Sequence, residues 1–299
     1  MAWLGRAAAG ADTLGGKAAS LDRLGRMGFN VPPGFCLTTE AFQMQLAALP
    51  DAVEAVGRLV ATRDAAHGAQ IAGRLVAAPL VPEVGTELAN ALATLDQLAR
   101  ERSGGQPPRL AVRSSAIGED GSAASYAGLH ETELDRSIDE VPGAVARCWA
   151  SLWSAPALAY RLRRSLPLDG AAMAVVVQEL VPADASAVAF TRHPVTGRDD
   201  QVVITTARGL GEAMVSGDVT PDTFVIDKAT RSVIDLEPGD EPVRPVSSEQ
   251  LASLIDLVLD VEAKFGAAVD VEAAISAGTW YLLQARPITT GVSAAGAAR

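Results

Sequence analysis

Four side chains near the C-terminus could together hold a metal ion and a phosphate: Asp270, Glu272, Gln284 and Arg286. Carboxylate and carboxamide oxygens suit a hard cation such as Mg²⁺, and the fork of an arginine matches the phosphate that accompanies it. This chemistry requires that the four side chains share one surface. The alternative is a hairpin with a solvated polar face, because strand alternation always produces such a face.

The segments that carry these residues are typical of a β-hairpin. Residues 268–275 and 279–287 are short and rich in β-branched and aromatic residues, and the three residues 276–278 between them end in glycine. Side chains alternate along a strand, so an odd-length loop places the four even-numbered residues on the same face. Pro287 cannot donate to a ladder and is expected to end the second strand.

Lys17 is a second candidate for phosphate binding. It follows Gly15-Gly16, and Leu21, Leu24 and Met27 recur after it at helical spacing. This pattern places the lysine at or near a helix N-terminus, where backbone N–H groups and the helix dipole attract anions. The segment is not a Walker A loop, because Ala18 follows the lysine where that motif needs Ser or Thr. A turn before a surface lysine is the alternative interpretation.

Arg113 is a third candidate. A short apolar strand starting at Leu110 carries it towards residues 114–132, which are dense in small and hydroxyl side chains that can order around phosphate oxygens. An ordinary polar loop is the alternative. His130 could act as a catalytic base, but nothing beside it forms a nucleophile pair, and His67 is interpreted as a surface histidine.

Composition restricts the class of protein. The chain has 299 residues, of which 48% are hydrophobic and 4% aromatic, and its net charge is −11. A charge of this sign argues against nucleic acid or an anionic membrane as the main partner. Two cysteines, no membrane-length apolar run and no apolar leader at the N-terminus predict a cytoplasmic protein.

The elements that must position these residues alternate between helical and extended patterns. Residues 40–102 are predicted to be helical, with interruptions near Pro50, Gly68, Pro79 and Pro82. The inward face of the last of these helices should consist of Leu88, Leu92, Leu95 and Leu98. Helices are also expected at 141–166 and 251–265, strands at 172–177, 186–191, 201–206 and 223–227, and a disordered tail at 291–299.

Taken in order, these segments resemble the nucleotide-binding domain of the pyruvate phosphate dikinase, phosphoenolpyruvate synthase and rifampin phosphotransferase family. The matching stretches are GGKAASL at 15–21, VPPGF at 31–35, AVRSSAIGED at 111–120, ASYAGLHET at 124–132, VVQELV at 176–181, AFTRHPVTG at 189–197, GLGEAMVSGDVTPDTFVIDK at 209–228 and DVEAAI…LLQARPIT from 270 to 289. The resemblance implies an α+β, ATP-grasp-like fold with two lobes that bind ATP. We expect the N-terminal lobe at 1–177 and the C-terminal lobe at 178–290.

The resemblance also assigns roles to residues. Lys17 and Arg113 become phosphate-binding groups, and Gly128 and Thr132 lie in the loop over the phosphates. Gln178 lies in a hinge strand near the adenine. Glu272 and Gln284 become Mg²⁺ ligands, and Arg286 contacts the phosphates, so that Lys17, Arg113 and Arg286 form the predicted catalytic set.

This chain also departs from the family pattern. Ile117, Leu129, Ala187 and Ala273 replace Thr, Gln, Gly and Trp, the residues usual there, and none of these changes removes a charged ligand. Family members normally continue into a domain whose histidine accepts the pyrophosphoryl group, and His67, His130 and His193 lie in no such motif. The resemblance therefore implies either a histidine-bearing partner in trans or a chain that is a fragment of a longer protein. An ATP sensor that has lost transfer and a free-standing ATP-grasp ligase are the alternatives.

Overall fold

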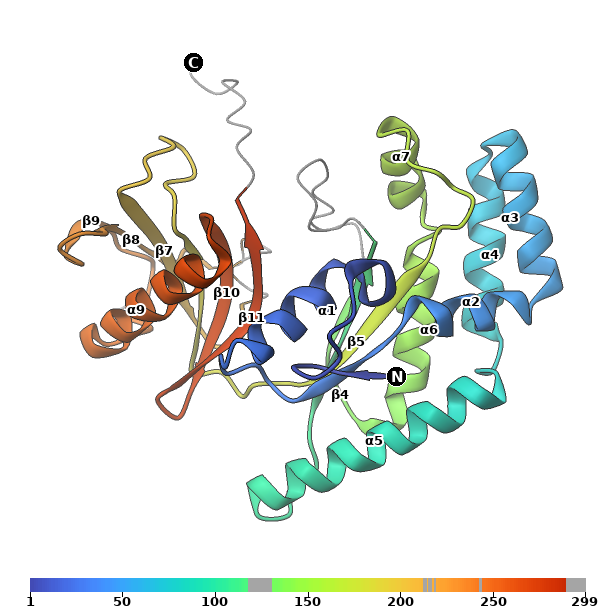
Figure 1. The fold of residues 1–299 in the computed structure, drawn as a ribbon, viewed down its shortest axis with the longest axis horizontal. Coiled ribbons are helices and arrows are strands. Elements are labelled where there is room, and N and C mark those ends of the chain that lie inside the picture. Colours follow the sequence, from blue (N-terminus) through green and yellow to red (C-terminus); the bar gives the residue numbers. More distant parts are fainter. Residues whose placement is uncertain (118–130, 212–213, 215–216, 218, 242–243, 289–299) are drawn as a thin grey trace. The chain divides into compact units, whose positions relative to one another are not determined.

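The computed structural model describes residues 1–117, 131–211, 214, 217, 219–241 and 244–288. The chain divides into two compact units, each with its own sheet (Figure 1). The first comprises Met1–Arg26 and Pro32–Leu180, and the second comprises Met27–Val31 and Val181–Arg299. The functional division into lobes at residues 177 and 178 stays a prediction. None of the helices in the described part of the chain combines the length and apolarity needed to cross a membrane.

The first unit is built on a five-stranded antiparallel sheet with the order β1-β2-β5-β3-β4. Its strands are β1 (Ala2–Trp3), β2 (Gly34–Leu37), β3 (Leu110–Ala116), β4 (Thr132–Arg136) and β5 (Met173–Glu179). The central strand β5 is the apolar run that the sequence predicts as a buried strand, and its residues from Met173 to Gln178 are all buried. Because this strand is buried on both faces, helices must cover the sheet on each side.

Cross-strand pairing assigns side chains to the two faces of this sheet. Phe35, Val112 and Val177 are neighbours on one face, and they belong to the main hydrophobic core. Cys36 and Val176 lie on the opposite face, where the Cys36 thiol lies 3.6 Å from the Leu14 carbonyl oxygen of the first helix. The sheet therefore separates a large core from a face covered by the N-terminal helix.

Helix α1 (Ala11–Arg26) covers that second face and is broken at Gly15, whose φ of 70° and ψ of 174° are not helical. The face opposite α1 is covered by helices, including α6 (Val141–Ser151), which lies on the other side of β5 in Figure 1. The remaining helices of the unit are α2 (Thr39–Ala47), α3 (Pro50–Thr62), α4 (Ala65–Ala77), α5 (Pro82–Ser103), the 3₁₀ turn η1 (Ile138–Glu140) and α7 (Ala155–Arg163).

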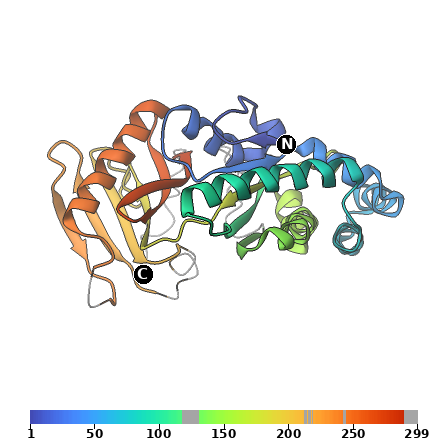
Figure 2. The ribbon, with the colours of Figure 1, turned by 90° about the horizontal axis from the view of Figure 1, so that it is seen from below.

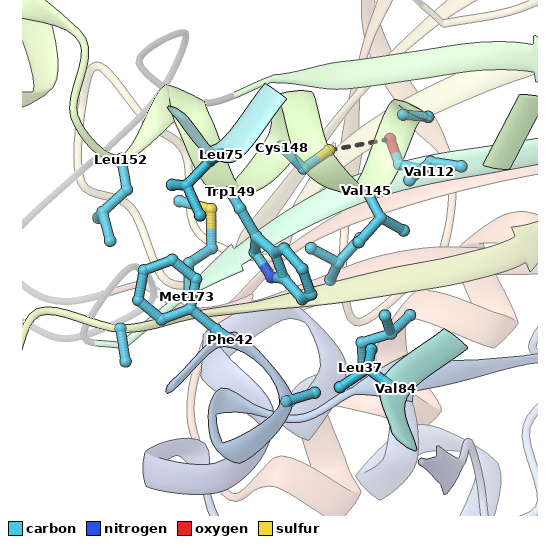
Figure 3. Packing of buried hydrophobic residues seen from close by; sticks show 14 of the residues in the cluster. Leu37, Phe42, Leu75, Val84, Val112, Val145, Cys148, Trp149, Leu152 and Met173 are labelled. Carbon is cyan, nitrogen blue, oxygen red and sulfur yellow. Dashed lines mark hydrogen bonds between the residues drawn. The ribbon is translucent and has the colours of Figure 1, made fainter. Parts of the chain in front are cut away.

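The core of the first unit centres on Trp149 of α6 (Figure 3). The Trp149 ring meets Phe42 of α2 edge to face, with ring centroids 5.9 Å apart. Leu75, Val112 and Met173 pack around it and are also fully buried or nearly so. Because these side chains come from α2, α4, α6 and the strands β3 and β5, this core joins the helices to the sheet.

The second unit is a six-stranded antiparallel sheet with the order β11-β10-β6-β7-β8-β9. Its strands are β6 (Ala185–Phe190), β7 (Gln201–Arg208), β8 (Asp222–Asp227), β9 (Val233–Glu237), β10 (Val269–Ser276) and β11 (Thr279–Pro287). Helix α9 (Ser248–Phe265) lies against one face of this sheet (Figure 2) and begins with a capping box formed by Ser247 and Gln250. The α+β class predicted from the sequence is confirmed.

Residues 27–31 belong to the second unit although the first unit precedes and follows them in sequence. The Leu282 N–H donates to the Asn30 carbonyl at 2.8 Å, so this segment lies along the edge strand β11. The Lys264 ammonium lies 4.2 Å from the centroid of the Phe29 ring and 3.4 Å from the Met27 carbonyl oxygen. These contacts protect an edge strand that would otherwise expose its hydrogen-bonding groups.

Several sequence expectations about elements were wrong in detail. Gly68 does not interrupt a helix but lies inside α4, where a Cβ would come within 2.4 Å of Leu158 Cδ1. Leu98 was expected in the buried face of α5 but is 39% exposed. The short strands β1 and β9 were not predicted, because β1 has only two residues and every residue of β9 is exposed or only partly buried.

Candidate nucleotide-binding site

The hairpin β10–β11 places the four C-terminal candidates as two directly opposed pairs. Asp270 pairs with Arg286 and Glu272 pairs with Gln284 in the register of the two strands. Opposed residues of an antiparallel pair point to the same face, so the four side chains share one surface, as the sequence predicts.

The reason for this register differs from the expected one. The loop has two residues, Ala277 and Gly278, both with positive φ, and Ser276 pairs with Thr279. With that loop alone Glu272 would face Leu283, but a β-bulge between Glu272 and Ala273 on the β10 side leaves Leu283 as an extra residue on β11. The bulge restores the pairing of Glu272 with Gln284.

Helix α9 covers the opposite face of this hairpin. The indole N–H of Trp280 on β11 lies 3.2 Å from the Gln250 carbonyl oxygen and 3.1 Å from the Ser253 hydroxyl, both on α9. Trp280 pairs with Ile275, whose side chain is buried on the same face. Alternation therefore directs Asp270 and Glu272 away from α9, to the opposite face of the sheet.

Asp270 and Arg286 form an ion pair across the two strands. Arg286 Nε and Nη2 each lie 2.8 Å from Asp270 Oδ2. Burial raises the pKa of Asp270 above its ordinary value, Arg286 opposes that shift, and Glu272 adds to it. The carboxylate is nearly buried while about a third of the arginine side chain is exposed, so Asp270 anchors a guanidinium that stays partly exposed.

Glu272 and Gln284 supply the oxygen donors of the candidate metal site. Gln284 is buried and Glu272 is half-buried. In the described residues no group of three His, Cys, Asp or Glu side chains forms a metal site made by protein alone. Mg²⁺ is usually held by one or two carboxylates together with substrate phosphates, so this donor set fits Mg²⁺ bound with a nucleotide.

In the first unit, the break at Gly15 places Lys17 in the first turn of a helix. The Ser115 hydroxyl accepts from the Ala18 N–H at 3.1 Å and donates to the Leu14 carbonyl at 2.8 Å, so it bridges the two sides of the break. A Cβ on Gly15 would lie 2.0 Å from the Ser115 carbonyl oxygen, which explains why glycine is needed at this close approach. Lys17 itself is half-buried.

Arg113, Thr132 and Gln178 lie on the α1 face of the first sheet. Arg113 pairs with Thr132 on one side and with Val176 on the other, and Gln178 is two positions beyond Val176 on β5. Cys36 pairs with Val176 and contacts α1, which identifies this as the face that α1 covers. Lys17, Arg113, Thr132 and Gln178 are thus gathered by one helix and one sheet face.

Gln178 also has a structural role. Its side chain is buried, and Nε2 donates to the Pro32 carbonyl at 2.8 Å, which ties β5 to the segment before β2. Gly34 pairs with Gln178, and a Cβ on Gly34 would lie 2.8 Å from the Gln178 Cα. One of the two N–H groups of the amide is therefore used in this contact, and the predicted proximity to adenine stays a prediction.

The candidates fall into two groups. The first unit gathers Lys17, Arg113, Thr132 and Gln178, and the second gathers Glu272, Gln284 and Arg286, with Asp270 beside Arg286. Gly128 lies outside the described residues. The sequence predicts Ser115 to be one of several hydroxyl residues in a loop, whereas it is a buried strand residue whose hydroxyl bridges the break before Lys17. In the sequence, the one signal for this role is that Ser115 lies two residues after Arg113.

Other reactive side chains are placed for structure. Both cysteines are free and buried, and burial raises the pKa of Cys36 to about 12, so its thiol stays protonated. The Nδ1 atom of His193 accepts from the backbone N–H groups of Val195 and Thr196, which closes a turn. His130 lies outside the described residues.

The chain is similar in sequence to proteins of one family. The profile of the family described as "Pyruvate phosphate dikinase, AMP/ATP-binding domain" matches residues 11–298. The chain is 36% identical to the rifampicin phosphotransferase of a Streptomyces species over 95% of its own length and 35% of that protein. It is 33% identical to a probable phosphoenolpyruvate synthase of Methanothermobacter thermautotrophicus, over 92% of this chain and 44% of that protein.

A further curated protein and a solved structure are also similar to this chain. The prodigiosin synthesizing transferase PigC of Serratia marcescens is 36% identical over 93% of this chain and 32% of that protein. The chain therefore spans less than half the length of these curated relatives. Among solved structures, a D-alanine–D-alanine ligase from Helicobacter pylori aligns with 63% of this chain and 45% of its own at 10% identity, with a TM-score of 0.30, which is too distant to inform the site.

Proposed function

Because this chain belongs to the pyruvate phosphate dikinase AMP/ATP-binding domain family, we propose that it binds Mg²⁺ and ATP and donates the pyrophosphoryl group to a histidine on a separate domain or protein. The histidine nitrogen would bond to the β-phosphorus, the bond from that phosphorus to the oxygen bridging the α-phosphate would break, and AMP would leave. The observation that carries the proposal is the paired register of Asp270 with Arg286 and of Glu272 with Gln284.

In the second unit, Glu272 and Gln284 would hold Mg²⁺ through a carboxylate and a carboxamide oxygen. The metal would neutralise charge on the phosphates. Arg286 would contact the phosphate oxygens, and Asp270 would keep the guanidinium in place through the pair described above. These residues are not required to transfer a proton, because phosphoryl transfer depends mainly on positioning and on charge neutralisation.

In the first unit, Lys17 and Arg113 would bind the phosphates. Lys17 lies in the first turn after the Gly15 break, where the dipole and N–H groups of the helix add to its charge. Thr132, beside Arg113, and Gly128 would belong to the loop over the phosphates, and Gln178 would lie near the adenine. Three cations and Mg²⁺ would then offset the charge of ATP inside a protein with a net charge of −11.

We propose a histidine as the acceptor of the pyrophosphoryl group because of the relatives of this chain. The curated relatives are longer than this chain, and two of them are named as phosphoenolpyruvate synthase and rifampicin phosphotransferase. A histidine carried by a separate polypeptide or by further sequence would complete such a transfer. The final phosphate acceptor would then be set by that partner.

The identity of the reaction products tests this proposal. The protein is incubated with Mg²⁺, an extract of its source cells and ATP labelled at the β-phosphate. We expect AMP, together with label on a second protein that is labile to acid and stable to base. Both should be lost in Glu272→Ala and retained in the control Glu237→Ala, which removes a carboxylate from the edge strand β9.

Other outcomes would replace the proposal. ATP binding without AMP or labelled protein would favour a nucleotide sensor. Release of ADP would favour a ligase that forms an acyl phosphate. Transfer that is unchanged in Glu272→Ala would refute the assignment of the metal site.

A further inference from the structure

Strand β4, which carries Thr132, lies at the edge of the first sheet, and among the described strands β3 is its single neighbour. Near Thr132 the two strands make two regular pairs, Arg113 with Thr132 and Val112 with Glu133. Towards the end of β4 a bulge interrupts the ladder. With so few regular pairs, side-chain contacts have to contribute to holding this part of β4 in place.

Thr132 and Glu133 point to opposite faces of the sheet, because they are consecutive residues of a strand. Thr132 lies opposite Arg113, on the face that α1 covers, and its side chain is exposed. Glu133 lies opposite Val112, which belongs to the main core on the other face. A group that holds Glu133 therefore positions Thr132 from the face opposite the proposed phosphate site.

Arg147 of α6 is the group that holds Glu133. Arg147 Nη2 donates to Glu133 Oε2 at 2.7 Å and Nε donates to Oε1, so the guanidinium contacts both carboxylate oxygens. The Glu133 side chain is 8% exposed, whereas that of Arg147 is 46% exposed. Arg136 Nε also lies 3.4 Å from this carboxylate, but Arg136 belongs to β4 itself. Arg147 thus joins the edge strand to a helix of the core.

The residue before Thr132 is fixed as well. The backbone N–H and the hydroxyl of Ser114 both donate to the Glu131 carbonyl oxygen, at 3.1 and 2.9 Å. The Glu131 N–H donates to the Ser151 hydroxyl at the end of α6, at 3.4 Å. Thr132 therefore lies between two residues that β3 and α6 hold in place.

We infer that Arg147 is a positioning residue of the nucleotide site, which acts through Glu133 to align Thr132 beside Arg113. This role rests on the proposed function and extends the site to a side chain on the opposite face of the sheet. Because Arg147 lies away from the α1 face, its removal should weaken recognition of the phosphates and leave recognition of the rest of the nucleotide unchanged.

The test compares ATP with AMP, which lacks the β- and γ-phosphates. Calorimetric titration with Mg²⁺ present measures both affinities in wild type, Thr132→Val, Arg147→Ala and Arg147→Lys. Arg147→Met/Glu133→Gln removes the ion pair without leaving a buried charge, so its fold should be kept even if Arg147→Ala unfolds. Arg74→Ala is the matched control, because it removes a partly exposed arginine whose Nη2 lies 2.7 Å from Asp51 of α3.

Thr132→Val should weaken ATP binding about tenfold, as the loss of a hydrogen bond to a charged group does. Arg147→Ala and Arg147→Met/Glu133→Gln should each weaken ATP binding about fivefold and AMP binding less than about twofold, because the Thr132 hydroxyl is misplaced but still present. Arg147→Lys should remain within about twofold of wild type, since lysine still pairs with Glu133. Arg74→Ala should bind both nucleotides as wild type does.

A double variant tests whether Arg147 acts through Thr132. Arg147→Ala/Thr132→Val should bind ATP as Thr132→Val does, because both changes remove one contact. The proposed role of Arg147 is overturned if the folded Arg147 variants bind ATP as wild type does, if they lose ATP and AMP affinity equally, or if the two effects multiply in the double variant.

The same data separate this role from the proposed function. Unchanged ATP affinity in Thr132→Val would refute the assignment of Thr132 to the phosphates, and the role of Arg147 with it. A loss of affinity in Thr132→Val without a loss in the Arg147 variants would refute the role of Arg147 alone.

Discussion

The two groups of candidate residues are positioned by different means. In the second unit, Glu272, Gln284 and Arg286 are aligned by the register of neighbouring strands, and each has its partner directly opposite. In the first unit, Lys17 depends on a break in α1 that is held by Ser115, about a hundred residues away in sequence. The hairpin site is thus specified locally, whereas the lysine site requires the packing of a helix on a distant strand.

This difference predicts where each site is vulnerable. The hairpin should tolerate loss of a functional side chain without loss of its fold, because the ladder is made by backbone groups. The α1 site should lose both stability and ligand affinity when the close approach of Gly15 to Ser115 is disturbed.

The largest expected effect is a loss of pyrophosphoryl transfer when a side chain of the hairpin β10–β11 is removed. Arg286→Ala should lower the rate of label transfer by about 10³-fold, the low end of what arginine contributes to phosphoryl transfer. The protein should stay folded but lose about 1–3 kcal/mol in the free energy of unfolding, because the nearly buried Asp270 carboxylate is left without its ion-pair partner. Arg231→Ala, which removes a surface arginine near β9, is the control. Wild-type transfer in Arg286→Ala would remove this residue from the site.

The second prediction concerns the break in α1. Gly15→Ala should lower the free energy of unfolding by about 3 kcal/mol, because the new Cβ meets the Ser115 backbone and φ is +70°. Gly57→Ala, at an open helical position, should instead raise stability by about 0.5–1 kcal/mol. Urea denaturation of both variants measures the contrast. A Gly15→Ala protein as stable as wild type would show that the break is not enforced.

The third prediction sharpens the role of Ser115. Ser115→Ala leaves the Ala18 N–H and the Leu14 carbonyl without this buried hydroxyl, so we expect a loss of about 1–2 kcal/mol in unfolding free energy. ATP affinity should fall with it, since the hydroxyl fixes the helix turn that carries Lys17. Thr94→Ala, which removes an exposed hydroxyl bonded to the Asn90 carbonyl, is the control. Unchanged ATP affinity would separate Ser115 from the lysine site.

The smallest effect is a pH dependence at the hairpin. Burial raises the pKa of Asp270 in the folded state, so the folded protein holds this proton more tightly than the unfolded chain does. The favourable contribution is present below the unfolded pKa of about 3.9 and is lost as the pH rises through the raised folded value. Relative to Asp270→Asn, wild type should therefore lose stability as the pH rises above about 4. A constant difference between the two proteins would contradict this.

Much of the hairpin could be predicted from the sequence because strand alternation is a local rule. Asp270, Glu272, Gln284 and Arg286 were expected on one face and lie there. The expectation rested on a three-residue loop, whereas the protein uses a two-residue loop and a bulge at Leu283. The shorter loop and the bulge offset one another, so the four residues share a face although the expected loop length was wrong.

The lysine site was less accessible to sequence reasoning. The start of a helix near Lys17 follows from Gly15-Gly16 and the leucines after it, and the structure agrees. The contact with Ser115 could not be predicted, because it depends on which strand α1 covers. Gly68 illustrates the same limit: its glycine suggested a break, but the residue is small to allow close packing of α4 against Trp153 and Leu158.

The most direct test of the account is calorimetric titration of the protein with ATP, with and without Mg²⁺. We predict Mg²⁺-dependent binding to wild type that is lost in Glu272→Ala and in Lys17→Ala, because each group of residues is required. Lys228→Ala, which removes a lysine paired with Glu262 on α9, should bind as wild type does. Wild-type affinity and Mg²⁺ dependence in Glu272→Ala would contradict the account.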